Sequence, residues 1–299
     1  MNPPGELSDT HIATVYDAVR AQVVGREEQI GSVLAVLAAG RDLLLEGPPG
    51  TSKSTILRAV TEHFGIPLVF VEGSAELTPA KLIGYHNPAD VVRRGYLPED
   101  FVHGPLPQAM SAGGFLYLEE FNRIPEDTLN TLLTAMAERE LTIPRVGRLV
   151  AEPSFRLVAA MNPFDHIGTT RVSQSIYDRL CRMAIGYQTE LQEREIVALR
   201  TGSSASALVA SAVRVTRATR GHPELRLGSS VRGAIDFVLV GEQLAAMRRL
   251  ALDNGALEPS LLHDAARLAL SSKVAVQEAA GLTPEQVLGT IVDAHLLDG

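Results

Sequence analysis

The segment with the clearest chemical meaning is the loop Gly47–Ser54, whose sequence is GPPGTSKS. In a loop of this kind the backbone N–H groups converge on nucleotide phosphates, a lysine meets their charge and a hydroxyl reaches Mg²⁺. Lys53 and Ser54 supply the last two groups, and Lys53 is one of only three lysines in the chain. Ser52 stands where the pattern has a second glycine, and we expect it in the first helical turn with its N–H directed to phosphate. The alternative is a plain Gly/Pro turn before Lys-Ser.

Two adjacent carboxylates, Glu119 and Glu120, follow the apolar run Phe115–Leu118. Neighbouring side chains of a strand point to opposite faces. We therefore expect Glu119 to face Mg²⁺ and Glu120 to orient and deprotonate an attacking water. Taken alone, two acids after a strand also fit a solvated helix cap. Combined with the phosphate loop, they indicate hydrolysis of a nucleoside triphosphate.

The elements that must position these groups are short apolar runs separated by helical segments. Near-continuous apolar strands of this kind indicate a parallel sheet covered by helices on both faces. The phosphate loop lies between the first strand and a helix predicted from Lys53 to about His63, and two further helices are predicted between Ile12 and Ala39. The strands are predicted at residues 41–46, 67–71, 114–118 and 155–160.

The pattern changes near Gln188, after which the spacing of apolar residues is helical. We therefore predict an α/β fold class, a P-loop parallel sheet with flanking helices, followed by an all-helical lid. The expected domains are residues 1–189, comprising N-terminal helices and the nucleotide-binding domain, and residues 190–299. Helices of the second domain are predicted at 190–201, 206–220, 230–251, 259–279 and 283–297.

Composition excludes several other classes of protein. The 299 residues are 45% hydrophobic and 21% charged, and no apolar run approaches the ~20 residues that span a bilayer. Cys181 is the only cysteine and residues 1–6 lack the pattern of a secretory signal, so we expect a cytoplasmic protein. The net charge of −8 argues against general affinity for nucleic acids. The eight histidines show no zinc-site spacing, and no G-x-S-x-G elbow is present.

These segments together resemble the AAA+ ATPases, and more narrowly the MoxR-like group, which carries an inserted hairpin before the strand that bears the acidic pair. The resemblance runs from Val24 to about Asp236. Besides the phosphate loop and the acidic pair, which continues as Phe121-Asn122-Arg123, it rests on further segments in family order. These are Val24–Glu27, Lys81–Tyr85 through Gly104–Leu106, Leu132–Glu138, Ala160–Pro163, Tyr177–Arg179 and Gly228–Arg232.

The resemblance implies a binding site for ATP and Mg²⁺. Ser54 and Glu119 correspond to the metal ligands, although the family usually has aspartate at the position of Glu119. The longer side chain changes the reach to hydrated Mg²⁺, so we expect slow turnover. The implied nucleotide contacts are Val24 and Gly25 at the adenine and Gly47, Pro48, Pro49, Gly50, Thr51, Ser52, Lys53, Ser54 and Thr55 at the phosphates.

Beside Glu120, the resemblance implies three more catalytic residues. Asn162 resembles sensor 1, which places water against the γ-phosphate, and Arg179 resembles the arginine finger that reaches a neighbouring subunit. Arg232 resembles sensor 2, with Arg226 as the competing candidate. The alternatives are an Asn-Pro turn, a helix-end salt bridge and a solvated helix face, respectively.

Two hairpins are implied as well. One is the inserted hairpin from about Leu82 to Pro105, which we interpret as a lever toward a partner, and its Arg93-Arg94 pair fits ordinary solvated charge equally well. The other spans Leu141–Val150 with a turn at Pro144–Gly147, and a plain surface hairpin is the alternative.

The function implied is an ATP-hydrolysing remodelling chaperone that works as a homo-oligomer, a hexameric ring, because each site needs its neighbour's arginine. Relatives of this group work with partners that bear a von Willebrand A domain, and some mature metalloenzymes such as molybdenum-containing carbon monoxide dehydrogenases. The expected partner is therefore a client protein complex, with no membrane insertion and no nucleic acid. Two alternatives stay open: a nucleic-acid motor of the helicase-related branch, and a nucleotide-gated scaffold without turnover, which Glu119 suggests.

Overall fold

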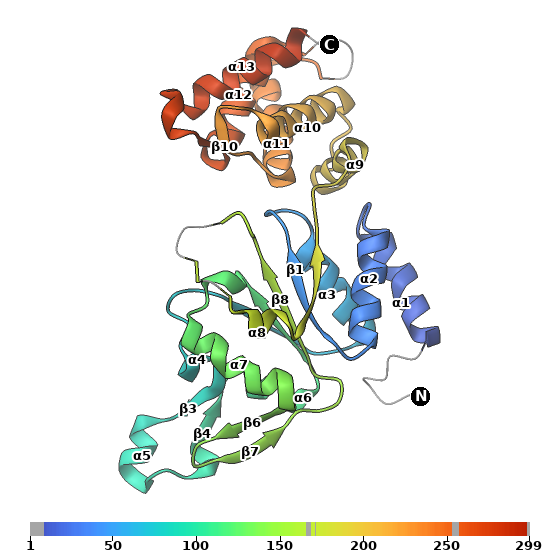
Figure 1. The fold of residues 1–299 in the computed structure, drawn as a ribbon. Coiled ribbons are helices and arrows are strands. Elements are labelled where there is room, and N and C mark those ends of the chain that lie inside the picture. Colours follow the sequence, from blue (N-terminus) through green and yellow to red (C-terminus); the bar gives the residue numbers. More distant parts are fainter. Residues whose placement is uncertain (1–8, 166–168, 171, 253–256, 298–299) are drawn as a thin grey trace. The chain divides into compact units, whose positions relative to one another are not determined.

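A computed structural model describes residues 9–165, 169–170, 172–252 and 257–297 and divides the chain into two compact units (Figure 1). The first unit comprises Met1–Pro48 and Ser52–Gly186, and the second comprises Pro49–Thr51 and Tyr187–Gly299. The N-terminal residues examined for a secretory signal lie outside the described part of the chain. Among the described residues, no helix is both long and apolar enough to cross a lipid bilayer.

A parallel sheet forms the centre of the first unit, with the strand order β2-β5-β8-β1-β9. Every neighbouring pair in it is parallel, so all of these strands end at the same edge of the sheet. This confirms the predicted α/β fold class. The bounds are β1 Asp42–Glu46, β2 Leu68–Glu72, β5 Phe115–Glu119, β8 Arg156–Met161 and β9 Leu180–Ala184.

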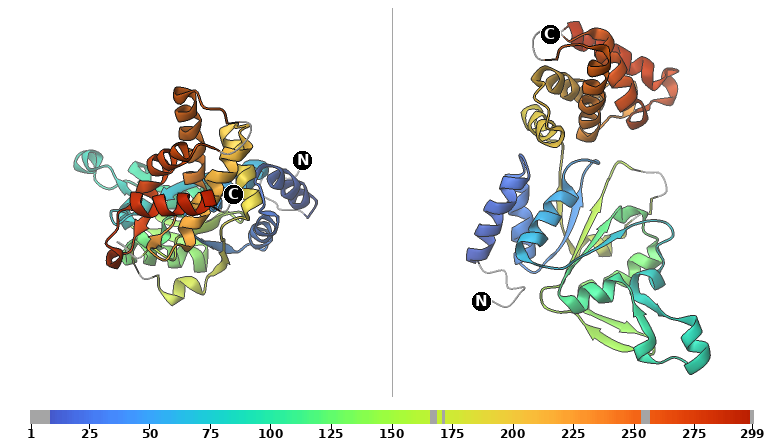
Figure 2. Two further views of the ribbon diagram at one scale, coloured as in Figure 1. Left: turned by 90° about the horizontal axis from the view of Figure 1, so that it is seen from above. Right: turned by 180° about the vertical axis from the view of Figure 1, so that it is seen from behind.

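Helices cover both faces of this sheet, as the apolar strands require (Figures 1 and 2). On one face, Leu43 and Leu45 pack against α1 (Asp9–Gln22), α2 (Glu27–Ala38) and α3 (Lys53–Phe64). On the other face, Leu44 belongs to a second core, built with the elements that follow β2 in the chain. Those helices include α4 Pro79–Ile83, α6 Pro105–Ala112, α7 Glu126–Glu138 and α8 Gln174–Tyr177.

Strand β9 is absent from the sequence prediction, whose four strands of the central sheet correspond to β1, β2, β5 and β8. It lies at the edge of the sheet, where only β1 pairs with it. Its middle residue, Arg182, is charged and exposed, so no continuous apolar run marks the strand. The strand at the opposite edge, β2, has the same exposure pattern but carries the apolar run Leu68–Val71, so the charged Arg182 is what hides β9 in the sequence.

The first unit also carries two antiparallel hairpins, which lie side by side (Figures 1 and 2). The guanidinium carbon of Arg145, between β6 and β7, lies 3.7 Å from the centroid of the Tyr96 ring in the inserted hairpin. This cation–π contact joins the two hairpins. The inserted one contains β3 Gly84–His86, α5 Pro88–Arg94, the 3₁₀ helix η1 Pro98–Asp100 and β4 Phe101–His103; the other contains β6 Glu140–Ile143 and β7 Gly147–Val150.

The second unit is mainly helical but also holds a short antiparallel sheet. The helix predicted over 259–279 ends at Leu270, which corrects that expectation. Two serines follow, and Val274 begins an extended segment that pairs with β10; serine and valine both favour helix less than alanine or leucine do. The elements are α9 Glu190–Thr201, α10 Ser206–Gly221, β10 Leu225–Leu227, α11 Val231–Arg248, α12 Pro259–Leu270, η3 Ser271–Lys273, β11 Ala275–Val276, η4 Glu278–Ala280 and α13 Pro284–Leu297.

Ser52 immediately precedes α3 and has left-handed backbone angles, φ +68° and ψ +15°. The expectation that it lies within the first helical turn is therefore wrong. A residue with a Cβ atom pays on the order of 1 kcal/mol for this conformation, whereas glycine adopts it without steric cost. This is the physical reason why the phosphate-loop pattern has glycine at the position of Ser52.

We predict that Ser52→Gly is more stable than Ser52→Ala by about 0.5–1 kcal/mol, because both variants lose the hydroxyl and only alanine keeps the strain. The entropy that glycine gains in the unfolded chain offsets part of the benefit. Equilibrium urea denaturation of the two variants under identical conditions measures the difference. Equal stability, or a more stable alanine variant, would show that the left-handed angles carry no cost.

Candidate functional site

The phosphate loop leaves the sheet at the end of β1 and is anchored on both sides. Gly47 N donates to the carbonyl of Met161 at 3.1 Å, which ties the loop to β8. Lys53 is buried, and its Nζ donates to the carbonyl oxygens of Gly47 at 2.8 Å and Pro48 at 2.9 Å. These bonds hold the ammonium group over the loop. Pro49, Gly50 and Thr51 complete the loop before Ser52, and Thr55 lies exposed in the first turn of α3.

Ser54 in the first turn of α3 contacts the end of β5. Its Oγ donates to Oε1 of Glu119 at 2.9 Å and lies 3.1 Å from the hydroxyl of Tyr117. Burial raises the pKa of the Tyr117 phenol above its ordinary value, so the hydroxyl stays protonated at neutral pH. A hydroxyl and a carboxylate are hard oxygen donors, and this donor set fits Mg²⁺.

Glu120 does not belong to the strand that carries Glu119, which changes the expected geometry. Strand β5 ends at Glu119, and Glu120 has left-handed angles, φ +52° and ψ +44°. The two carboxylates are therefore separated by a turn of the backbone and not by the alternation of a strand. The chain continues as a 3₁₀ helix, η2, over Phe121–Arg123.

A close approach of β2 to the acidic pair sustains this turn. Gly73 N, directly after β2, donates to the carbonyl of Glu119 at 2.7 Å. A Cβ atom at Gly73 would lie only 2.4 Å from the carbonyl oxygen of Glu120. Only glycine fits at this position without displacing the acidic pair.

Arg123 connects Glu120 with the loop that follows β8. Its Nε lies 3.3 Å from Oε2 of Glu120, and its Nη2 forms an ion pair with Asp165. The hydrogen bond with Asp165 raises the pKa of Arg123 above its ordinary value. The neighbouring Asn122 donates from Nδ2 to the carbonyl of Asn162 at 3.3 Å. The turn after β5 and the turn after β8 are thus joined by side-chain contacts.

Asn162 follows the last residue of β8. Because β8 lies between β5 and β1, Asn162 emerges between the acidic pair and the phosphate loop. Its Oδ1 accepts a hydrogen bond from the backbone N–H of Phe164 at 3.2 Å, which is the turn geometry considered as the alternative. The turn and the position beside the phosphate loop therefore occur together.

Arg179 is not brought to the phosphate loop of its own chain. It immediately precedes β9, where Leu180 pairs with Asp42, whereas the phosphate loop follows Glu46 at the other end of β1. Its side chain is exposed and donates from Nη1 to the carbonyl of Ser175 at 2.6 Å. Arg179 and the phosphate loop thus lie at opposite ends of the parallel strands.

The other predicted residues lie at the start of the chain and in the second unit. Val24 and Gly25 form the turn between α1 and α2, next to Arg26, whose buried guanidinium donates from Nη2 to the carbonyl of Gly186 at 2.8 Å. Arg226 is exposed on β10, and Arg232 is exposed in the first turn of α11.

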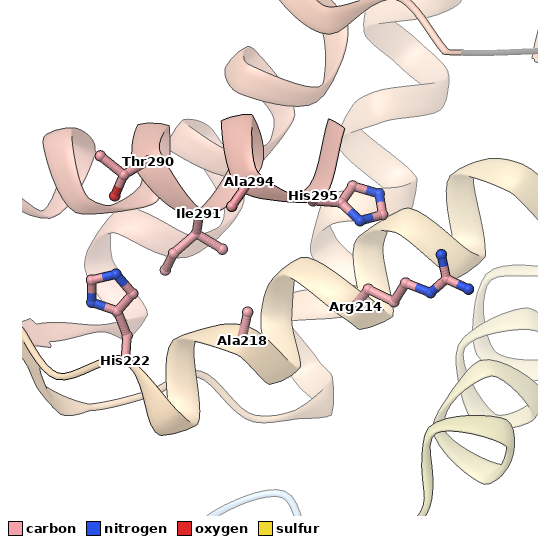
Figure 3. Close-up of a pocket in the computed structure, with 7 residues that line it drawn as sticks. All are labelled: Arg214, Ala218, His222, Thr290, Ile291, Ala294 and His295. Carbon is pink, nitrogen blue, oxygen red and sulfur yellow. The ribbon is translucent and has the colours of Figure 1, made fainter. Parts of the chain in front are cut away.

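A pocket of about 480 Å³ lies between α10 and α13 within the second unit (Figure 3). None of its lining residues was predicted as a site residue. Apolar side chains meet at its centre, and Arg214, His222 and His295 stand around them. The Nε of Arg214 also donates to Oε1 of Glu190 at 3.2 Å. The full lining is Arg214 and Ala218 from α10, His222 directly after it, and Thr290, Ile291, Ala294 and His295 from α13.

Sequence reasoning missed three residues of the first unit's site: Gly73, Tyr117 and Arg123. For Tyr117 a signal existed, because it precedes Glu119 by two positions in a strand and so shares its face. Arg123 follows Glu120 by three positions, the spacing that meets across one helical turn. Gly73 had no local signal, since its role depends on how β2 pairs with β5.

The chain is similar to several known proteins. The family described as "AAA domain (dynein-related subfamily)" matches residues 42–180. The chain is 28% identical over 225 residues to the gas vesicle ATPase GvpN of Ancylobacter aquaticus, covering 68% of this chain and 61% of GvpN. It is 29% identical over 181 residues to the chaperone MoxR1 of Mycobacterium tuberculosis, covering 60% of this chain and 45% of MoxR1. The chain thus spans about half the length of these relatives.

A solved structure from Cytophaga hutchinsonii has the same fold, with a TM-score of 0.52 and 20% sequence identity over 95% of this chain and 94% of that one. The names of GvpN and MoxR1 bear out the resemblance that the motifs carry. Residues 42–180 match the AAA domain of the dynein-related subfamily, and the chain resembles the MoxR-like AAA+ ATPases.

Proposed function

We propose that this chain hydrolyses ATP at the edge of the sheet where β1, β8 and β5 end. One observation carries the proposal: Ser54 of the phosphate loop donates to Glu119 of the acidic pair at 2.9 Å. This contact joins the phosphate loop to the acidic pair. The names of two relatives, an ATPase and a chaperone, support the same activity.

Ser54 and Glu119 would hold the Mg²⁺ that accompanies ATP. The oxygen donors of these two side chains match the preference of that cation. When bound, Mg²⁺ neutralises negative charge on the phosphate oxygens. Lys53 adds a buried positive charge, and its bonds to the loop carbonyls keep it above the backbone that the phosphates approach.

Glu120 is the proposed base that orients the attacking water and accepts its proton. Its left-handed backbone turns the carboxylate away from the strand, and the ion pair with Arg123 restrains it. Asn162 is proposed to place the same water, since it emerges between the two loops. For sensor 2 we propose Arg232, with Arg226 as the competing residue.

We propose further that the working unit is a hexameric ring. At about 3.3 Å per residue, the four steps from Asp42 to Glu46 put roughly 13 Å between the two edges of the sheet. Arg179 lies at the edge away from its own phosphate loop, which supports a role at the site of a neighbouring copy. A guanidinium supplied in this way is worth about 10³–10⁵ in rate.

The ring is proposed to remodel a client protein complex in the cytoplasm. The inserted hairpin is the proposed lever, because Val92 and Tyr96 are exposed there and the Arg145 contact couples it to the second hairpin. The proposed clients are complexes that need maturation, including metalloenzymes such as molybdenum-containing carbon monoxide dehydrogenases, reached through a von Willebrand A domain partner. A net charge of −8 makes nucleic acid a poor partner.

Replacing the proposed base tests the chemistry. We expect Glu120→Gln to lower kcat for ATP hydrolysis by about 100-fold or more, because the amide cannot accept the proton, while the affinity for ATP changes little. Phosphate release and nucleotide binding measure the two effects. Glu126→Gln, an exposed glutamate in the first turn of α7, is the matched control and should keep full activity.

Undiminished hydrolysis by Glu120→Gln would refute the assignment of the base. A wild-type protein that forms rings with ATP and releases no phosphate would refute ATP hydrolysis and leave the scaffold alternative.

Mixing inactive variants tests whether two copies share a site. Lys53→Ala and Arg179→Ala should each be nearly inactive alone, yet mixed rings should recover part of the activity. Some interfaces then pair an intact Lys53 with an intact Arg179 of the next copy. A mixture of Lys53→Ala with Glu120→Gln is the control and should recover no activity. Lys53 and Glu120 act at the same subunit's phosphate loop, so every site in the mixed ring lacks one of them. Steady-state ATPase assays of mixed and unmixed samples measure the recovery, and its absence in the first mixture would contradict the shared site.

Affinity capture tests the client. We expect the Glu120→Gln variant with ATP to retain a multisubunit complex from the native host, because a ring that binds but does not cleave nucleotide stays engaged. Lys53→Ala is the control, since loss of the phosphate-binding charge should abolish retention. Mass spectrometry of the captured proteins identifies the complex. Equal recovery with both variants would contradict nucleotide-dependent engagement.

A further inference from the structure

Tyr117 places a polar hydroxyl inside an apolar core. It is fully buried in β5, and its neighbours Leu116 and Leu118 face the opposite core. A phenylalanine ring would satisfy the same packing, as Phe115 does on the same face. Burying a hydroxyl without a hydrogen bond costs free energy, so the contact with Ser54 Oγ at 3.1 Å explains how this hydroxyl is accommodated.

The direction of the hydrogen bonds follows from the chemistry of the three groups. Ser54 has one hydroxyl proton and donates it to Oε1 of Glu119, so that proton lies between Ser54 and Glu119. The hydroxyl of Tyr117 must then donate to the Ser54 oxygen. The result is a chain of two hydrogen bonds that runs from Tyr117 through Ser54 to Glu119.

This chain fixes the orientation of the Ser54 oxygen completely. The oxygen has four tetrahedral directions, namely its bond to Cβ, its proton and two lone pairs. The proton of Ser54 points to Glu119, and one lone pair accepts the hydrogen bond from Tyr117. The other lone pair is the single direction that remains for a cation.

We infer that Tyr117 is a positioning residue for the cation that accompanies the nucleotide. Its hydrogen bond to Ser54 keeps the second lone pair of the Ser54 oxygen directed toward that cation. This inference rests on the proposed function, because it assigns a part in the binding of Mg·ATP. Tyr117 acts through Ser54, because its side chain is fully buried and its hydroxyl contacts the Ser54 oxygen.

The packing around Tyr117 makes it suited to this task. Its ring lies 5.7 Å, centroid to centroid, from that of Phe70 on β2, and the guanidinium of Arg58 on α3 lies over the Phe70 ring at 5.5 Å. The phenol therefore holds its hydroxyl at a point set by the sheet. Glu119 has one more rotatable bond than an aspartate would have. Its hydrogen bond alone therefore restrains the direction of the Ser54 hydroxyl less than an aspartate's would. Tyr117 supplies the second, fixed contact.

The Mg²⁺ dependence of nucleotide binding tests the inference. In Tyr117→Phe we expect the Mg²⁺ concentration for half-maximal binding of N-methylanthraniloyl-AMPPNP to rise about 3- to 10-fold, the loss expected for one hydrogen bond. Binding measured without Mg²⁺ should stay within about 2-fold of wild type. Tyr16→Phe removes the same atom from α1 and is the matched control, which should leave both values unchanged.

Thermal unfolding without nucleotide gives a second readout, because Tyr117→Phe should shift the melting temperature in opposite directions in two backgrounds. Tyr117→Phe should lower the melting temperature by about 2 °C in the wild-type background, where it removes a hydrogen bond. In the Ser54→Ala background it should raise the melting temperature by a similar amount, because the buried hydroxyl has lost its acceptor. There Tyr117→Phe should also have no further effect on the Mg²⁺ midpoint.

An unchanged Mg²⁺ midpoint in Tyr117→Phe would overturn the inference, and so would a shift that persists in the Ser54→Ala background. Both results are distinct from failure of the proposed function. If the proposed function itself were wrong, the wild-type protein would bind no nucleotide at any Mg²⁺ concentration, and the inference would be overturned as well.

Discussion

A parallel strand delivers the loop that follows it to the same edge of the sheet as its neighbours, and the order β5-β8-β1 puts three such loops next to one another. The acidic pair, Asn162 and the phosphate loop come from segments far apart in the sequence, and only this order unites them. The order in turn requires strands that are apolar on both faces, because helices cover each side. The buried run Leu43–Leu45 illustrates the requirement, since alternate residues enter different cores.

Much of this arrangement can be predicted from local sequence, and the exceptions have physical reasons. The central strands β1, β5 and β8 can be recognised as apolar runs because both of their faces are buried. Strand β9 gives no such run, because the charged residue Arg182 interrupts it. The segment after Leu270 has helical spacing over a few residues, yet β10 offers Ala275–Val276 a pairing partner, and tertiary pairing outweighs local preference there.

At the site, residue types are predictable and backbone angles are not. Lys53, Ser54 and the two glutamates follow from chemistry that needs a cation, a hydroxyl and carboxylates at known spacing. The turn at Glu120 depends instead on β2, because Gly73 leaves room for the Glu120 carbonyl. Tyr117 is hidden for a related reason. In the sequence it looks like another apolar residue of β5, and only the position of α3 above the strand gives its hydroxyl a partner.

Both loops of the site turn at a residue with left-handed backbone angles that is not glycine, Ser52 before α3 and Glu120 after β5. Each costs on the order of 1 kcal/mol, and such strain persists only where the surroundings hold it. At Glu120 the hydrogen bond from Gly73 to the Glu119 carbonyl and the ion pair with Arg123 do so. The carboxylate is thereby aimed by the backbone and not by side-chain rotamers alone. On the proposed function, the base is oriented before ATP arrives, so little reorganisation remains for the step in which charge develops.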